Sequence, residues 1–175
     1  MTDIGPNNPG TAVSDASPPT AQVWNNPDNI KISDNTYASS VSSTFGSTRY
    51  LKATNFGFSI PADAIIKGVS VGIEHGHIGP FAADWAVQII KSDGTLGDTN
   101  KAKGTVWSSG VDETYSYGGN DDLWDEVWTA ADINNANFGV VLQAYMYNTT
   151  ALVDNIHITV HYTPVSSSPL PTFLP

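Results

Sequence analysis

The segment Gly68–Gly72 has the Gly-x-Ser-x-Gly spacing of a serine-hydrolase nucleophile, with Ser70 at its centre. Asp154 followed by His157 or His161 would complete the chain order of an esterase triad. A nucleophile elbow needs a strand, a strained turn and then a helix, whereas Ser70 lies inside an alternating apolar run with no helical segment after it. We therefore predict that Ser70 is a serine on the outer face of a strand.

Two histidine pairs have a spacing that places both rings on one face of a strand, namely His75 with His77 and His157 with His161. Imidazole pairs can bind zinc or copper. Glycine and proline follow His77 closely, which indicates that the strand ends there, so we expect solvent-facing or loop histidines. The chain has no cysteine, which excludes disulfides, thiolate metal sites and cysteine nucleophiles.

Acidic residues gather at Asp121, Asp122, Asp125 and Glu126. A glycosidase needs two carboxylates that flank a sugar, but neighbouring carboxylates in one loop usually form a solvated turn. None of these patterns specifies catalysis, and we predict that the protein is not an enzyme.

Asp and Asn side chains in predicted turns and strand edges supply oxygen atoms of the kind that calcium binds. Residues of this kind are Asp28, Asn29, Asp34, Asn35, Asp93, Asp98 and Asp154, and we take Asp34 and Asp154 as the candidate calcium ligands. None of them has the spacing of an EF-hand, and the same residues build β-turns. A structural calcium ion is thus an alternative to plain turns, and no other cofactor is predicted.

Several aromatic residues could stack on sugar rings. Trp85 alternates with Val87 and Ile89 and is predicted to belong to the core. The predicted glycan contacts are those in glycine-rich stretches, Tyr115, Tyr117 and Trp124.

The elements that must position these residues have a period of two, as expected for strands buried on one face. The alternating sets are Val69, Val71 and Ile73; Trp85, Val87 and Ile89; Val140, Leu142, Ala144 and Met146; and Ile156, Ile158, Val160 and Tyr162. The one helical candidate is a single turn at 129–134, capped by Thr129 or Asp132. The pattern predicts an all-β, antiparallel, jelly-roll-like β-sandwich, with 138–147 and 152–162 paired as a central hairpin.

We divide the chain into an extended N-terminal arm at 1–22, a sandwich domain at 23–162 and a proline-rich C-terminal tail at 163–175. The arm is rich in Pro, Gly, Asn, Ser and Thr and has few apolar residues with which to offset its ordering entropy. Contacts to a capsid or to other subunits are predicted at Ile4, Pro6, Val13, Pro18, Leu170, Phe173 and Leu174.

The chain has 17 acidic and 7 basic residues and a formal net charge of -10. Such a charge repels a phosphate backbone and anionic lipids, so nucleic acid and membranes are not expected as partners. The first residues include no basic residue and no apolar run, so no secretory signal is expected.

The region from Trp24 to Tyr162 resembles the jelly-roll-like β-sandwich domains in structural proteins of tailed bacteriophages. The resemblance rests on four stretches of sequence: 24–38 (Trp-Asn-Asn-Pro-Asp-Asn-Ile to Tyr-Ala), 56–69 (Phe-Gly-Phe-Ser-Ile-Pro to Ile-Ile-Lys-Gly-Val), 130–140 (Ala-Ala-Asp-Ile-Asn to Asn-Phe-Gly-Val) and 153–156 (Val-Asp-Asn-Ile).

This resemblance implies an assembly role and carries over no catalytic residue. The role nearest to it is that of a capsid decoration, or cement, protein, made in the host cytoplasm and carried on the virion exterior. Its expected partners are further copies of itself, as a homotrimer, and the lattice of the major capsid protein. The alternative is a carbohydrate-binding module or adhesin that uses the loop aromatics.

Overall fold

The computed structural model describes residues 1–165, in which the chain forms ten strands and two short helical turns. The turns are the 3-10 turn η1 (Pro27–Ile30) and the α-helical turn α1 (Ala130–Ile133). The strands are β1 (Thr2–Asn7), β2 (Thr11–Ser14), β3 (Ala38–Ser42), β4 (Gly46–Ser47), β5 (Leu51–Thr54), β6 (Ile65–Ile78), β7 (Phe81–Ile90), β8 (Glu113–Gly118), β9 (Gly139–Tyr147) and β10 (Thr149–Thr163).

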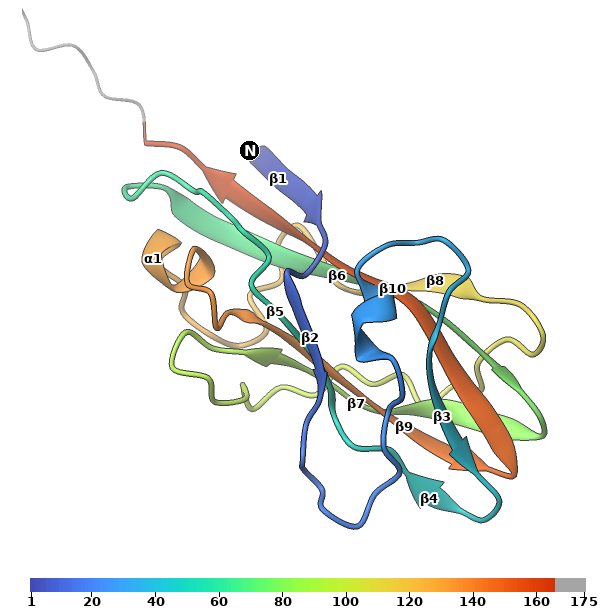
Figure 1. The fold of residues 1–175 in the computed structure, drawn as a ribbon. Helices are drawn as coiled ribbons and strands as arrows, with labels where there is room; N and C mark the ends of the chain where they lie inside the picture. The colour runs from blue at the N-terminus through green and yellow to red at the C-terminus, as the bar shows by residue number, and fades with distance from the viewer. Residues whose placement is uncertain (166–175) are drawn as a thin grey trace, which may run out of the picture.

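The strands form two antiparallel sheets, which pack as a β-sandwich (Figure 1). In the first sheet the long strands β6 and β10 pair along their whole length, and β8 pairs with the other edge of β6. The short strands β1 and β3 share the free edge of β10, where they pair with successive parts of it. In the second sheet β9 pairs with β7 on one side and with β5 and β4 on the other, and β2 extends β5. The predicted all-β antiparallel sandwich is confirmed.

The core lies between the two sheets and consists of the alternating apolar residues of the long strands. Their buried members, each at most 1% exposed, are Val69, Val71, Ile73, Val87, Ile89, Val140, Leu142, Ala144, Met146, Ile156, Ile158 and Val160. Burial of alternate side chains in strands of this length provides the main hydrophobic stabilisation of the fold.

Two tight connections carry the chain from one sheet to the other. Gly79 and Pro80 join β6 to β7, and Asn148 alone joins β9 to β10. Gly79 and Asn148 have φ values of 138° and 43°, in the left-handed region that permits such sharp turns. The predicted hairpin of 138–147 with 152–162 is therefore wrong, because these strands face each other across the core. Alternation shows which face of a strand is buried, but not which sheet the strand joins.

The predicted N-terminal arm is also wrong, because residues 2–7 and 11–14 are strands of the sandwich. β1 pairs with β10 and β2 pairs with β5, so each sheet receives one N-terminal strand. Composition underestimates the tendency of such segments to form strands. Pairing with an open sheet edge satisfies their backbone N–H and C=O groups without large apolar side chains. At the other end, Thr163 closes β10, so the tail begins later than predicted.

Other local predictions are confirmed. The turn α1 is capped by Thr129, whose side chain and that of Asp132 form a reciprocal capping box.

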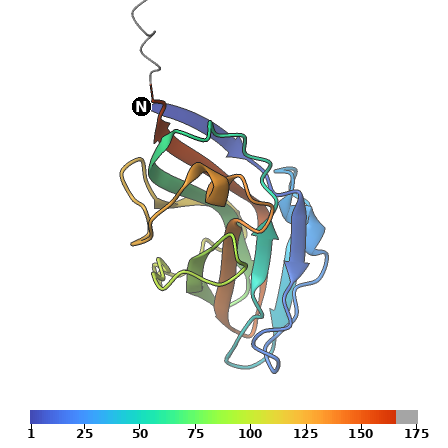
Figure 2. The ribbon, with the colours of Figure 1, turned by 90° about the vertical axis from the view of Figure 1, so that its left-hand side faces the viewer.

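The segments next to residues 1 and 165 lie at the same end of the sandwich, where β1 runs beside the end of β10 (Figure 2). None of the helices in the described residues is long and apolar enough to cross a membrane.

Candidate functional site

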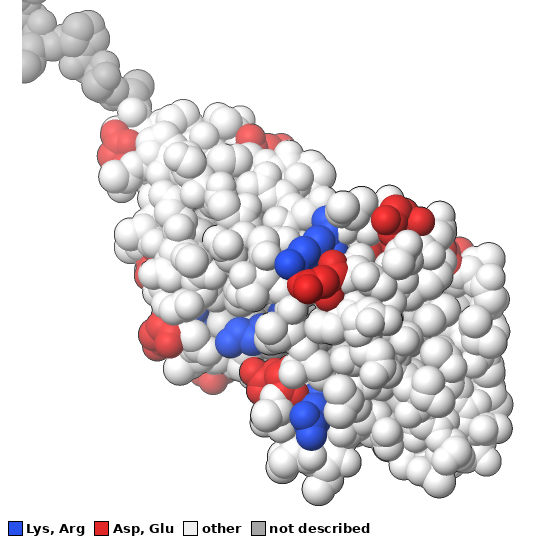
Figure 3. All heavy atoms as spheres, in the orientation of Figure 1, with Lys and Arg blue, Asp and Glu red and all other residues white. Residues whose placement is uncertain are grey.

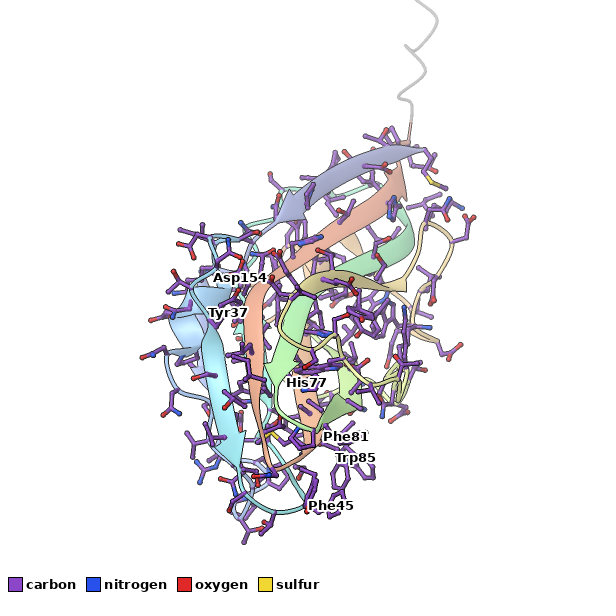
Figure 4. The ribbon with its side chains drawn as sticks, turned by 90° about the vertical axis from the view of Figure 1, so that its right-hand side faces the viewer. Tyr37, Phe45, His77, Phe81, Trp85 and Asp154 are labelled. Carbon is purple, nitrogen blue, oxygen red and sulfur yellow. The ribbon has the colours of Figure 1, made fainter. Side chains whose placement is uncertain are left out.

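Five aromatic side chains form a partly exposed cluster at one end of the second sheet, which we call the aromatic patch: Phe45, Phe81, Trp85, Tyr145 and Tyr147. Phe45 is 64% exposed, Trp85 56% and Tyr147 39%. The rings of Phe45 and Tyr147 are stacked with centroids 4.2 Å apart, and Trp85 lies 5.2 Å from Tyr145. Phe45, Phe81 and Trp85 gather at one end of the molecule in Figure 4. Three large aromatic side chains are thus open to a partner.

A β-bulge explains why Trp85 belongs to this surface and not to the predicted core. Asp84 pairs with Ala144 and Ala86 pairs with Gln143, so Trp85 is an extra residue in β7. An extra residue shifts the alternation of side chains by one position. Val87 therefore still faces the core, while Trp85 points outward.

The strand ends and turns around the aromatic patch have no exposed charged side chain, since the one charged residue between Phe81 and Trp85, Asp84, is buried. Residues 38–48, 75–83 and 138–153 contain no Asp, Glu, Lys or Arg. In Figure 3 the corresponding part of the visible face, over β3 and β4, is also free of acidic and basic side chains. A patch of this kind favours a contact driven by burial of apolar surface over one steered by charge.

The three predicted glycan contacts lie elsewhere and are largely unavailable. Tyr117 and Trp124 are only 2% and 1% exposed, and Tyr115 is packed against the core. Tyr115 and Tyr117 belong to β8, which pairs with β6, and not to a loop. The indole Nε1 of Trp124 donates to the carbonyl of Val69 at 2.9 Å. The glycine-rich surroundings indicated a loop, whereas the chain there forms an edge strand and a turn folded onto it.

Tyr117 instead belongs to a buried polar network centred on Asp84. The Asp84 carboxylate accepts hydrogen bonds from the Tyr117 hydroxyl at 2.7 Å, Trp107 Nε1 at 2.8 Å and the Lys103 backbone N–H at 3.2 Å. His75 Nε2 lies 3.6 Å from the same carboxylate. Burial lowers the pKa of His75 to about 4, although Asp84 acts in the opposite direction, so this histidine is neutral near pH 7.

The first histidine pair is not exposed, contrary to the prediction of solvent-facing or loop histidines. His75 and His77 are buried, because β6 continues to Ile78. The ring of His75 lies between Trp107 and Tyr115, and His77 Nδ1 is 3.3 Å from the Thr149 hydroxyl.

Ser70 lies on β6 as predicted, in a hydrogen-bonded row across three strands. Its hydroxyl is 2.8 Å from Nε2 of His161, and Nδ1 of His161 is 2.8 Å from the Asp3 carboxylate. The acid is thus Asp3 of β1 and not Asp154. The neighbouring backbone of β6 and β10 is engaged in strand pairing, whereas an oxyanion hole needs N–H groups free to converge on the substrate. The row therefore links strands β1, β10 and β6.

Three of the four acidic residues at 121–126 contact side chains of the segment 91–101. Asp122 pairs with Lys101 at 2.8 Å and Glu126 lies 3.9 Å from Lys91. The Thr99 hydroxyl donates to Asp125 at 2.6 Å.

Of the two predicted calcium ligands, Asp34 forms a turn, whereas Asp154 lies in a cluster of carboxylates. The Asp34 carboxylate accepts a hydrogen bond from the Thr36 N–H, which closes an Asx turn. Asp154 lies in β10 near Glu74 and Asp112, with ligand oxygens of the three residues within 4.8 Å of one another. Glu74 and Asp112 were not predicted as ligands, because they are far from Asp154 along the chain.

The residues predicted to contact a capsid are dispersed. Ile4 packs against the core, Val13 is 41% exposed on β2, Pro6 is exposed and Pro18 is half-buried. Leu170, Phe173 and Leu174 lie outside the described residues.

Comparisons with known proteins reveal no family. No family model and no curated protein matches the chain. The chain is similar to part of a solved structure described as a structural analysis of an exo-beta-agarase, with 10% sequence identity and a TM-score of 0.40 over 74% of this chain. The match covers 20% of the agarase chain, so the protein spans about a fifth of that length, and the likeness concerns the fold alone.

Proposed function

We propose that this protein is a non-enzymatic virion structural protein, of the capsid-decoration type, that associates with neighbouring copies through the aromatic patch. The observation that carries the proposal is the exposure of Phe45, Trp85 and Tyr147 on an uncharged end of an otherwise acidic molecule. Exposed aromatic clusters rimmed by polar residues commonly mark protein contacts. The resemblance of the sandwich to tailed-phage structural domains supplies the setting.

Net charge supports a second copy as the occupant. Copies with a formal charge of -10 repel one another, and this repulsion is weakest where the facing surfaces have no charged side chains. Burial of Trp and Tyr rings then provides the attraction, since such residues dominate the energy of protein interfaces.

The test is the solution mass by light scattering over a range of concentrations. We expect the full chain to form a closed oligomer, for which the sequence-based expectation is a trimer, and we expect Phe45→Ser with Trp85→Ser to shift it to monomer. The matched control is Val127→Ser, because Val127 is 92% exposed but lies outside the aromatic patch. A wild-type chain that is monomeric throughout would overturn the proposed self-association.

Virion placement needs a separate measurement. Immunogold labelling of particles released by the source organism should place the protein on their exterior, and labelled particles should be lost with the double variant. Absence of the protein from particles that contain a major capsid protein would contradict the proposed role.

A carbohydrate-binding module is the second candidate, favoured by the exposed indole of Trp85 beside Tyr145. In this case a glycan screen should retain the monomeric protein, and Trp85→Ser should abolish retention. Small-molecule sites usually add several convergent polar groups to such rings. Apart from Phe45, the segment 38–48 contains only Ala, Val, Ser, Thr and Gly, with no charged or amide side chain.

A further inference from the structure

Three carboxylates from separate parts of the chain meet beside the first sheet. Glu74 comes from the middle of β6, Asp112 precedes β8, and Asp154 is an extra residue in β10, between the positions paired with His75 and Glu74. One oxygen from each of the three lies within 4.8 Å of the others. Bulges often redirect a side chain toward a functional site, and this one directs Asp154 away from the alternation of its strand.

Two of these oxygens lack the partners that buried carboxylates need. Asp154 is only 1% exposed, and its Oδ2 accepts a hydrogen bond from the Asn35 N–H at 3.1 Å. Its Oδ1 is buried with no hydrogen-bond partner, and so is Oδ2 of Asp112. Burying an unpaired charged oxygen is costly, so these atoms point to a missing ligand.

Within the described residues, none of the three carboxylates forms an ion pair with a basic side chain. The ion pairs within residues 1–165 involve Asp3, Asp28, Asp84, Asp122 and Glu126, and none involves Glu74, Asp112 or Asp154. Like charges at such short separations repel one another, and more strongly where water is excluded. The arrangement is unfavourable unless a cation lies among the three groups.

The surroundings leave room for an ion and its water. A cleft of about 270 Å³ borders the cluster, and its lining includes Asn35, Tyr37, Gly76 and Asp112. Tyr37 and Asp154 lie close together in Figure 4. The Tyr37 hydroxyl donates to Oδ1 of Asn35 at 3.3 Å, so both side chains border the same cleft.

We propose that Glu74, Asp112 and Asp154 bind one calcium ion, which joins β6, β10 and the segment before β8. The ligand set is oxygen only, which suits hard cations and not zinc or copper. Calcium accepts six to eight oxygen ligands in flexible geometry, whereas magnesium demands near-ideal octahedral geometry, keeps several waters and usually takes only one or two carboxylates, so three protein carboxylates favour calcium. Carbonyl groups and water would complete its six to eight ligands. This site is independent of the proposed function.

Thermal unfolding of the full chain tests the site. The wild-type melting temperature should rise by several degrees when EDTA is replaced by millimolar CaCl2, and less with MgCl2. Asp112→Asn and Asp154→Asn should each abolish most of the rise. In EDTA, Asp112→Asn should melt at or above the wild-type temperature, because it removes a repelling charge. Asp63→Asn, at an exposed position away from the cluster, should behave as wild type.

A spectroscopic measurement locates the ion even where a variant folds poorly. Terbium, which replaces calcium at oxygen sites, should emit on excitation of tyrosine, and Tyr37→Phe should lower this emission while keeping the calcium-dependent rise in melting temperature. No rise in the wild type, or an equal rise in Asp112→Asn, would overturn the site. An equal response to magnesium would overturn the choice of calcium.

Discussion

At the scale of residues, the buried network around Asp84 shows how a polar cluster can serve stability. Asp84 accepts three hydrogen bonds, so its buried carboxylate is well satisfied. Burial and the Asp84 charge also raise the pKa of Tyr117 far above its usual range, so this hydroxyl remains a donor at all relevant pH values. Neutral His75 fills the space between Trp107 and Tyr115 without bringing in a second charge.

The first prediction concerns pH. Burial lowers the pKa of folded His75 to about 4, against about 6.5 in the unfolded chain, so below pH 6.5 the unfolded state binds a proton that the folded state does not. The free energy of unfolding should fall as pH decreases from 6.5 toward 4, by about 2 kcal/mol between pH 6.5 and 5. The lowered pKa of His157 adds a change of the same sign.

Urea unfolding at a series of pH values measures this slope. His75→Gln should lower the free energy of unfolding at pH 7 but reduce its dependence on pH between 6.5 and 5. The control His157→Gln should keep most of this pH dependence. A wild-type slope that survives His75→Gln would show that other groups cause the pH dependence.

At the scale of elements, the strands of the sandwich can be predicted from the sequence, whereas its β-bulges cannot. Alternation in the long strands predicted most of the core, and a single helical turn capped by Thr129 or Asp132 could be predicted from the local sequence. Both bulges were invisible, since nothing in the local sequence marks Trp85 or Asp154 as an extra residue. Bulges depend on pairing with a distant strand, so the exposed indole and the carboxylate cluster could not be found by counting residues along one strand.

A glycine at the start of β9 gives the second prediction. A side chain does not fit at Gly139, because an added Cβ would collide with the carbonyl of Ala53 in β5. Gly139→Ala should therefore cost about 1–3 kcal/mol of unfolding free energy. Gly46→Ala is the matched control, because an added Cβ there has no neighbour within 4 Å. Equal stability of the two variants would contradict this account.

At the scale of the whole molecule, charge and apolar surface are segregated. The strand ends that carry the aromatic patch have no exposed charged side chains, since Asp84 is buried there, while the other acidic residues lie on the rest of the chain. If copies associate through this patch, the long-range force between them is repulsive and the short-range force is attractive.

The third prediction follows from this separation. Raising the salt concentration shortens the Debye length from about 30 Å at 0.01 M to about 8 Å at 0.15 M, which screens repulsion but leaves apolar burial intact. The association constant from sedimentation equilibrium should increase over this range. A decrease would indicate that ion pairs hold the oligomer together and would exclude the aromatic patch as its main contact.

The two ends of the described chain and the aromatic patch lie at opposite ends of the sandwich. Both leave the sandwich at the end remote from Phe45 and Trp85. A molecule tethered through either end would hold its aromatic rings outward, at the full length of the sandwich from the tether. Reporter proteins or surface anchors fused at residue 1 or after the last strand should therefore leave the rings accessible, which makes the domain suitable for display on a particle or a bead.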